Sequence, residues 1–259
     1  MIRVGIVGMG VIGTAIAKAI MDGIRDVSLA GVTVRDPARA QGHPVFPLDD
    51  LIERSDLVVE AATQSALREL APSVLGAGKD LMVLSVGGLV GVLEEWARLA
   101  DKHGARILVP SGAIAGLDGV KGAREGSIAA VTMETRKSPR GLAGAPYIEE
   151  RRIDLSALGE ETLIFEGTAH EAVRAFPANV NVVAALSLAG VGPERTRIKV
   201  FAVPGLERNQ HRITVEGEFG RLRIEVENVP SENPRTGKLS YLSAIAMLRD
   251  LGSSLRVGS

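Results

Sequence analysis

The sequence predicts an α/β protein: an N-terminal Rossmann domain with a doubly wound parallel sheet, then an α+β domain with a mostly antiparallel sheet. Up to about residue 110, short apolar runs alternate with helical segments, which is typical of a parallel sheet covered by helices. Further along, residues 221–227 alternate strictly between polar and apolar, and this pattern indicates a half-exposed antiparallel strand. A glycine-rich turn after the first strand predicts a nucleotide site in the first domain.

That turn lies between a strand at residues 2–7 and a helix over 14–20. Its glycines have the G-x-G-x-x-G spacing of a dinucleotide fingerprint. We expect the first glycine to permit the tight turn, the second to let the backbone approach a pyrophosphate, and the third to let the helix lie close to its strand. The free N–H groups of the helix would then face the phosphates. The predicted cofactor contacts here are Gly8, Met9, Gly10, Val11, Ile12 and Gly13.

The second strand, at 27–34, is followed by Arg35 and Asp36. An acidic residue near this position binds the ribose 2′-OH in NAD enzymes, whereas an arginine accommodates the 2′-phosphate of NADP. Alternatively, both side chains lie in a solvated loop before Pro37. Both residues are predicted cofactor contacts, and the predicted cofactor is NAD or NADP.

Strands at 56–60, 81–85 and 106–109 and helices at 64–75 and 92–103 complete the first domain. Ligands of open α/β sheets bind beyond the carboxyl ends of the strands. The loop at 86–88 is therefore either part of the cofactor site or a simple glycine turn. Gly87 in this loop and Ala62 are predicted cofactor contacts.

At Pro110 the pattern changes. Residues 111–119 indicate a loop turning into a short helix that Ser111 could cap, and Thr168 and Glu171 form a capping box at the start of another helix. Further strands are predicted at 128–137, 198–203, 210–215 and 221–227, and a further helix at 178–190. We expect residues 111–230 to form the catalytic and dimerisation domain.

The last helix, at about 238–251, has an apolar stripe. We expect it to return to the first domain, which would then consist of residues 1–110 and 231–259. The predicted stripe is made of Leu239, Leu242, Ile245, Ala246 and Leu248.

His211 and two asparagines are the polar residues of interest in the second domain. His211 shares a predicted strand face with Ile213 and Val215, so it is either a satisfied core residue or an acid/base group with a suitable pKa near 6.5. Asn179 and Asn181 lie in the first turn of an otherwise apolar predicted helix. They either satisfy local N–H groups or form the polar floor of a ligand pocket.

The 259 residues carry a net charge of −1 and contain no cysteine. Without a basic stripe, we expect neither nucleic acid nor a membrane surface as the main partner. The lack of cysteine excludes disulfides and cysteine nucleophiles, and no metal-ligand spacing is present. No apolar run reaches the ~18 residues of a membrane span, and the first residues lead into a strand rather than a signal peptide. We expect a cytoplasmic protein.

Four stretches, with the N-terminal fingerprint, resemble the L-aspartate dehydrogenases that feed NAD biosynthesis. They are V-P-S-G-A-I-A-G-L-D-G at 109–119, F-E-G-T-A through F-P-A-N-V-N-V at 165–182, N-Q-H with G-E-F-G at 209–220, and E-N-P-R-T at 232–236. The resemblance implies a homodimer of two-domain subunits. It also implies NAD(P)-dependent oxidative deamination of L-aspartate, through iminoaspartate, to oxaloacetate and ammonia, in a reversible reaction.

The resemblance also assigns site residues. It implies that His211 is the active-site histidine and that Ala113, Ala115 and Asn181 contact the cofactor. We expect helix N-termini at 111–113 and 177–179 to donate N–H groups to the substrate or cofactor, which makes Ser111, Gly112 and Asn179 predicted substrate contacts. The sequence does not choose among Lys137, Lys199 and Arg136 as the cation for the substrate carboxylates.

One departure from the family pattern is Val203-Pro204, where the family often has Asp-Pro. If that aspartate helps to place the substrate or the histidine, activity or substrate choice differs here. Two alternative functions stay open. One is another two-domain NAD(P)-dependent oxidoreductase, similar to homoserine dehydrogenase or dihydrodipicolinate reductase, since fold does not fix function. The other is a non-catalytic dinucleotide-binding regulator.

Overall fold

The computed structural model describes residues 1–178, 180–229, 237–255 and 257–258. It divides into two compact units. The first consists of Met1–Pro110 and Tyr241–Val257, and the second of Ser111–Ser240 and Gly258–Ser259. No helix among the described residues is both long and apolar enough to cross a membrane.

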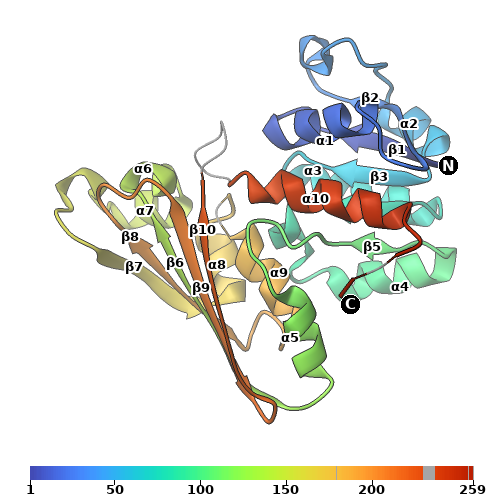
Figure 1. Cartoon of the computed structure of the whole chain (residues 1–259). Helices are drawn as coiled ribbons and strands as arrows, with labels where there is room; N and C mark the ends of the chain where they lie inside the picture. The colour runs from blue at the N-terminus through green and yellow to red at the C-terminus, as the bar shows by residue number, and fades with distance from the viewer. Residues whose placement is uncertain (179, 230–236, 256, 259) are drawn as a thin grey trace. The chain divides into compact units, whose positions relative to one another are not determined.

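The first unit is built on a parallel five-stranded sheet (Figure 1). The strand order is β2-β1-β3-β4-β5, so the chain moves from β1 to one side and returns to the other, and the switch point lies between β1 and β3. The predicted doubly wound parallel sheet is confirmed. Its strands are β1 (Ile2–Val7), β2 (Val27–Thr33), β3 (Leu57–Glu60), β4 (Asp80–Val83) and β5 (Ile107–Leu108).

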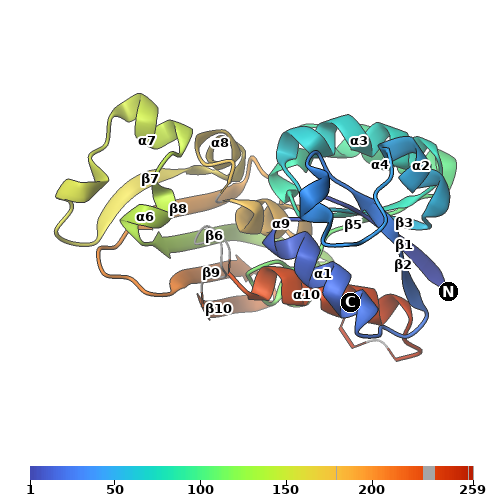
Figure 2. The same ribbon diagram turned by 90° about the horizontal axis from the view of Figure 1, so that it is seen from above.

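Helices lie on both faces of this sheet (Figure 2). The helices between its strands are α1 (Val11–Met21), α2 (Leu48–Arg54), α3 (Gln64–Gly76) and α4 (Leu93–His103), with short 3-10 turns η1 (Pro37–Ala40) and η2 (Val86–Leu89). The four residues of β3 are all buried, because a strand covered on both faces has no solvent side.

The C-terminal helix α10 (Leu239–Leu251) packs on the same face of the sheet as α1, which confirms its predicted return (Figure 2). Ala244 and Leu248, one helical turn apart, are fully buried with Ile16 of α1 and Val4 of β1. The predicted apolar stripe was partly wrong, because Leu242 is half exposed and Ala246 is exposed. Apolar residues surround much of this helix, so periodicity alone does not select the buried side.

The second unit is a mixed five-stranded sheet in the order β10-β9-β6-β8-β7. Only β6 and β8 pair in parallel, and the other three pairs are antiparallel, so the predicted mostly antiparallel sheet is confirmed. Helices α8 and α9 cover one of its faces (Figure 2). The strands are β6 (Ile128–Lys137), β7 (Thr162–Thr168), β8 (Thr196–Ala202), β9 (Asn209–Gly217) and β10 (Gly220–Asn228), and the helices are α5 (Leu117–Arg124), α6 (Pro139–Leu142), α7 (Pro146–Arg151), α8 (Ala169–Ala175), α9 (Asn181–Ala189) and the 3-10 turn η3 (Leu155–Ala157).

Two helix starts in this unit differ from the prediction. Ser111 does not cap a helix: its carbonyl accepts a turn hydrogen bond from Ile114, and α5 begins only after Gly116, which has a φ of +76°. Helix α9 begins at Asn181 rather than at 178. The expectation of helix N-termini at 111–113 and 177–179 was therefore wrong for the described residues. By contrast, the Thr168 and Glu171 capping box is confirmed.

Candidate functional site

The glycine fingerprint has the geometry of a phosphate-binding turn. Gly8 follows β1 with a φ of +95°, a conformation that disfavours any side chain. A Cβ on Gly13 would collide with the carbonyl oxygen of Gly8, so this glycine lets α1 start close to the turn. Gly10 is the N-cap of α1, and apart from Gly10 and its chain neighbours no heavy atom of the described residues lies within 4 Å of the place where its Cβ would be. The space over Gly10 and the free N–H groups that follow it fit a pyrophosphate.

The loop after β3 borders this turn across the switch point. A Cβ on Gly8 would lie 2.9 Å from the Cβ of Ala62, so these two predicted cofactor contacts are brought together. Gly87 lies in η2, in the loop after β4. The carboxyl ends of β1, β3 and β4 thus carry the predicted residues at the sheet edge where ligands of this fold bind.

A fully buried carboxylate, Glu60, connects the loop after β3 with the loop after β4. One oxygen accepts the N–H of Ala62 at 2.8 Å and the hydroxyl of Ser85 at 2.9 Å, and the other accepts the N–H of Ser85 at 2.9 Å. Burial raises the pKa of Glu60, and the donors from Ser85 and Ala62 oppose that shift. Glu60 was not predicted as a site residue. The available signal was an acidic residue at the end of an apolar strand.

Glu60→Gln is expected to lower the free energy of unfolding by about 1–3 kcal/mol, because an amide NH₂ replaces an oxygen opposite an N–H donor and leaves that donor unsatisfied. Chemical denaturation measures the change. Glu69→Gln, on the exposed surface of α3, is the matched control and should change stability little. Equal stability of Glu60→Gln and wild type would contradict this role.

Arg35 and Asp36 are both exposed. The Asp36 carboxylate accepts the N–H of Ala38 at 3.0 Å and caps η1. This contact orders the loop beyond β2 but does not choose between NAD and NADP, so a cofactor role for these two residues stays a prediction.

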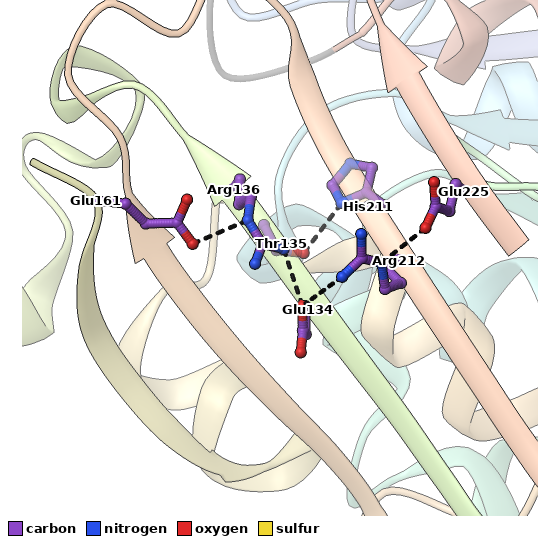
Figure 3. Close-up of polar contacts among 7 residues, drawn as sticks. All are labelled: Glu134, Thr135, Arg136, Glu161, His211, Arg212 and Glu225. Atoms are coloured by element: carbon purple, nitrogen blue, oxygen red, sulfur yellow. Dashed lines mark hydrogen bonds and ion pairs between the residues drawn. The ribbon is translucent and has the colours of Figure 1, made fainter. Parts of the chain in front are cut away.

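His211 lies on the covered face of the second unit's sheet and is 4% exposed. Its Nδ1 is 3.0 Å from the hydroxyl of Thr135, which is opposite it on β6 (Figure 3). Burial lowers the pKa of His211 to about 3, and the charge of Lys137 contributes to the shift. The imidazole is therefore neutral at pH 7.

Lys137, on the same strand as Thr135, is also buried. Burial lowers the pKa of its ammonium group to about 8. We call Thr135, Lys137 and His211 the buried polar cluster. The backbone N–H of Val203, at the position where the sequence departs from the family pattern, donates to the carbonyl of Lys137 at 2.8 Å.

Thr135→Val is expected to lower kcat roughly tenfold, because Thr135 orients the imidazole by one hydrogen bond, worth about 1 kcal/mol. Thr135→Ser keeps the hydroxyl and should retain most of the activity. Steady-state kinetics at saturating cofactor tests both variants. Equal loss in the valine and serine variants would indicate a packing role instead.

The remaining predicted residues of the second unit lie in two other segments. Ser111, Gly112, Ala113 and Ala115 are in the loop before α5. Asn228, at the end of β10, donates its Nδ2 to the carbonyl of Ala113 at 2.6 Å and ties this loop to the sheet. Asn181 is the first residue of α9, and Asn179 lies outside the described residues. The cofactor and substrate roles of these residues stay predictions.

Arg136 and Lys199 lie on the other face of the sheet from His211. The Arg136 guanidinium pairs with Glu134 at 2.9 Å and Glu161 at 3.0 Å (Figure 3). Lys199 lies 3.7 Å from Glu166, and both side chains are nearly half exposed. Among the described residues, no group of three or more His, Cys, Asp or Glu side chains could hold a metal ion.

A dinucleotide-binding turn at a switch point, together with a second unit that holds a buried histidine, defines a two-unit dinucleotide-dependent dehydrogenase. Family models agree: residues 118–251 match "Aspartate dehydrogenase, C-terminal" and residues 8–110 match "Homoserine dehydrogenase, NAD binding domain". The chain therefore belongs to the L-aspartate dehydrogenase family.

Individual relatives support this assignment along the whole chain. The chain is 46% identical over 271 residues to an L-aspartate dehydrogenase of Methanosarcina mazei, with complete coverage of both proteins. It is 47% identical to the enzyme of that name from Bradyrhizobium diazoefficiens, covering all of this chain and 94% of the relative. The crystal structure of aspartate dehydrogenase from Thermotoga maritima matches with a TM-score of 0.78 and 26% identity, over the full length of both chains.

Proposed function

We propose that this protein catalyses the NAD(P)-dependent oxidative deamination of L-aspartate, through iminoaspartate, to oxaloacetate and ammonia, and the reverse reaction. The observation that carries this proposal is His211, neutral and buried beside Thr135 and Lys137, in a chain similar over its whole length to L-aspartate dehydrogenases.

A bound nicotinamide cofactor would supply the hydride acceptor for oxidation at the substrate Cα. Gly8, Gly10 and the first N–H groups of α1 would hold its pyrophosphate. Glu60 would keep the loops that contain Ala62 and Gly87 in place beside it.

His211 would act as the proton acceptor. For its Nε2 to carry a lone pair, Nδ1 must hold the ring proton and donate it to the Thr135 hydroxyl. In the deamination direction Nε2 takes a proton from the substrate amine or from the water that attacks the imine carbon. In the amination direction the same nitrogen returns a proton.

The test is NADH and NADPH oxidation, followed at 340 nm, with oxaloacetate and ammonia, paired with reduction of NAD and NADP by L-aspartate. Turnover that requires both oxaloacetate and ammonia supports the proposal, and the ratio of the two cofactors reports on Arg35 and Asp36. Turnover of homoserine or a dihydrodipicolinate substrate instead would support the alternative oxidoreductases. Dinucleotide binding without any turnover would support a regulator.

Several finer features belong to this proposal. The family resemblance favours a homodimer, a cytoplasmic location and a supply of iminoaspartate to NAD biosynthesis. Sedimentation analysis tests the dimer, and complementation of a strain unable to make iminoaspartate tests the biosynthetic role.

A further inference from the structure

The second unit contains a buried cation, Lys137, whose role in the reaction is not assigned. We propose that Lys137 binds a carboxylate of the dicarboxylic substrate, on the same sheet face as His211. This inference rests on the proposed function and specifies which of the three candidate cations serves it.

The strand register places Lys137 with His211. Residues Val131, Met133, Thr135 and Lys137 alternate onto the buried face of β6. Thr135 is directly opposite His211, so Lys137 is the diagonal neighbour of His211 on that face, within reach of a long side chain. Its charge acts on the imidazole. Arg136 and Lys199 lie on the other face of the sheet, away from His211, where they pair with glutamates.

The surroundings of Lys137 favour binding of an anion. Lys137 is packed beside residues that, apart from Thr135, are apolar: Leu142, Phe176, Val180, Ile198 and Val200. In such a low-dielectric region an ammonium attracts a carboxylate more strongly than at the surface. Aspartate and oxaloacetate each carry two ionised carboxylates at neutral pH. Their site therefore requires cationic groups or N–H donors.

A carboxylate at Lys137 would also change His211. The positive charge of Lys137 helps to lower the pKa of the imidazole, and a bound negative charge opposes that effect. Binding of the substrate would therefore raise the pKa of His211 towards its ordinary range. The imidazole would become a better proton acceptor only when a substrate is present.

The test compares Lys137→Met, which removes the charge but keeps the length, with Lys199→Met as the matched control. Lys137→Met should raise the KM for oxaloacetate about 10- to 100-fold, as expected for loss of a charge-assisted contact, with a smaller change in kcat and an unchanged affinity for NADH. Succinate, titrated calorimetrically into the NADH-saturated enzyme, should lose affinity by a similar factor. Lys199→Met should resemble wild type.

A pH series provides an independent measurement on the wild-type protein. The described groups packed near Lys137 include the titratable His211 from β9, the hydroxyl of Thr135, and apolar residues from β8, α6 and the segment between α8 and α9. Burial lowers the pKa of Lys137 to about 8, so succinate affinity should fall as pH rises above 8. Lys137→Arg stays charged at this pH, so any succinate binding it retains should not vary there.

The outcomes separate this inference from the proposed function. If wild type turns over oxaloacetate with ammonia but Lys137→Met keeps its KM and its succinate affinity, Lys137 is not the carboxylate ligand. A loss of kcat in Lys137→Met without a change in KM or succinate affinity would also contradict the assignment of Lys137. If wild type shows no turnover, the proposed function fails, and the succinate titration with its pH series still decides whether Lys137 binds a dicarboxylate.

Discussion

Replacing His211 with alanine is expected to lower kcat by about 10²- to 10⁴-fold, the usual contribution of a general acid/base group. The loss should appear in both directions of the reaction, because the same nitrogen accepts and returns the proton. NADH affinity should stay near the wild-type value, since His211 is not among the predicted cofactor contacts and the fingerprint belongs to the first unit. Pre-steady-state and steady-state kinetics at 340 nm measure the change.

Two variants make this result specific. His170→Ala removes a partly exposed histidine that pairs with Glu194 at 2.6 Å, and it should leave kcat unchanged. His211→Asn keeps a polar group near Thr135 and limits the cavity, but it provides no basic nitrogen. Its kcat should be as low as that of the alanine variant. A kcat near wild type in either His211 variant would remove His211 from the proton-transfer role.

The alternation of residues along β6 and β9 was predictable because one face of each strand is buried. A period of two places Ile213 and Val215 with His211, and Met133 with Thr135, and all five are buried. The same alternation places Lys137, two residues beyond Thr135, on this buried face and Arg136 on the other. The alternation along β6 was thus the signal in the sequence that places Lys137 on the same sheet face as His211.

Other features of the fold and the site could not be predicted from local sequence patterns. Strand β7 was not predicted, because it is an edge strand whose register shifts between Leu163 and Phe165. The role of Glu60 depends on Ser85, 25 residues away, and no periodicity shows this contact. The anchor from Asn228 to Ala113 spans 115 residues. Such contacts follow from strand order, and local patterns do not determine it.

Gly10→Ala is expected to weaken NADH binding more than tenfold with little loss of stability. The backbone of Gly10 has φ −78° and ψ −164°, which an alanine adopts easily. Within the described part of the chain, the new Cβ would have no heavy atom within 4 Å other than those of residue 10 and its chain neighbours. The unbound protein should therefore tolerate the methyl group, at a cost below about 1 kcal/mol from the weaker N-cap. The methyl group would occupy the space through which the backbone approaches the pyrophosphate. Fluorescence titration with NADH and thermal melting measure the two effects.

Gly13→Ala is the matched variant. It should change stability in the direction opposite to that of a glycine-to-alanine substitution within an ordinary helix. Glycine to alanine within a helix normally stabilises by about 0.5–1 kcal/mol. Here the new Cβ collides with the carbonyl oxygen of Gly8, a backbone atom that cannot move unless α1 shifts away from the turn. Such overpacking costs about 1–3 kcal/mol, and the shift also displaces the N–H groups that bind phosphate. Both variants should therefore bind NADH weakly, but only Gly13→Ala should melt at a lower temperature. Wild-type NADH affinity in Gly10→Ala would mean that the pyrophosphate does not approach this turn, and the cofactor assignment of the fingerprint would fail.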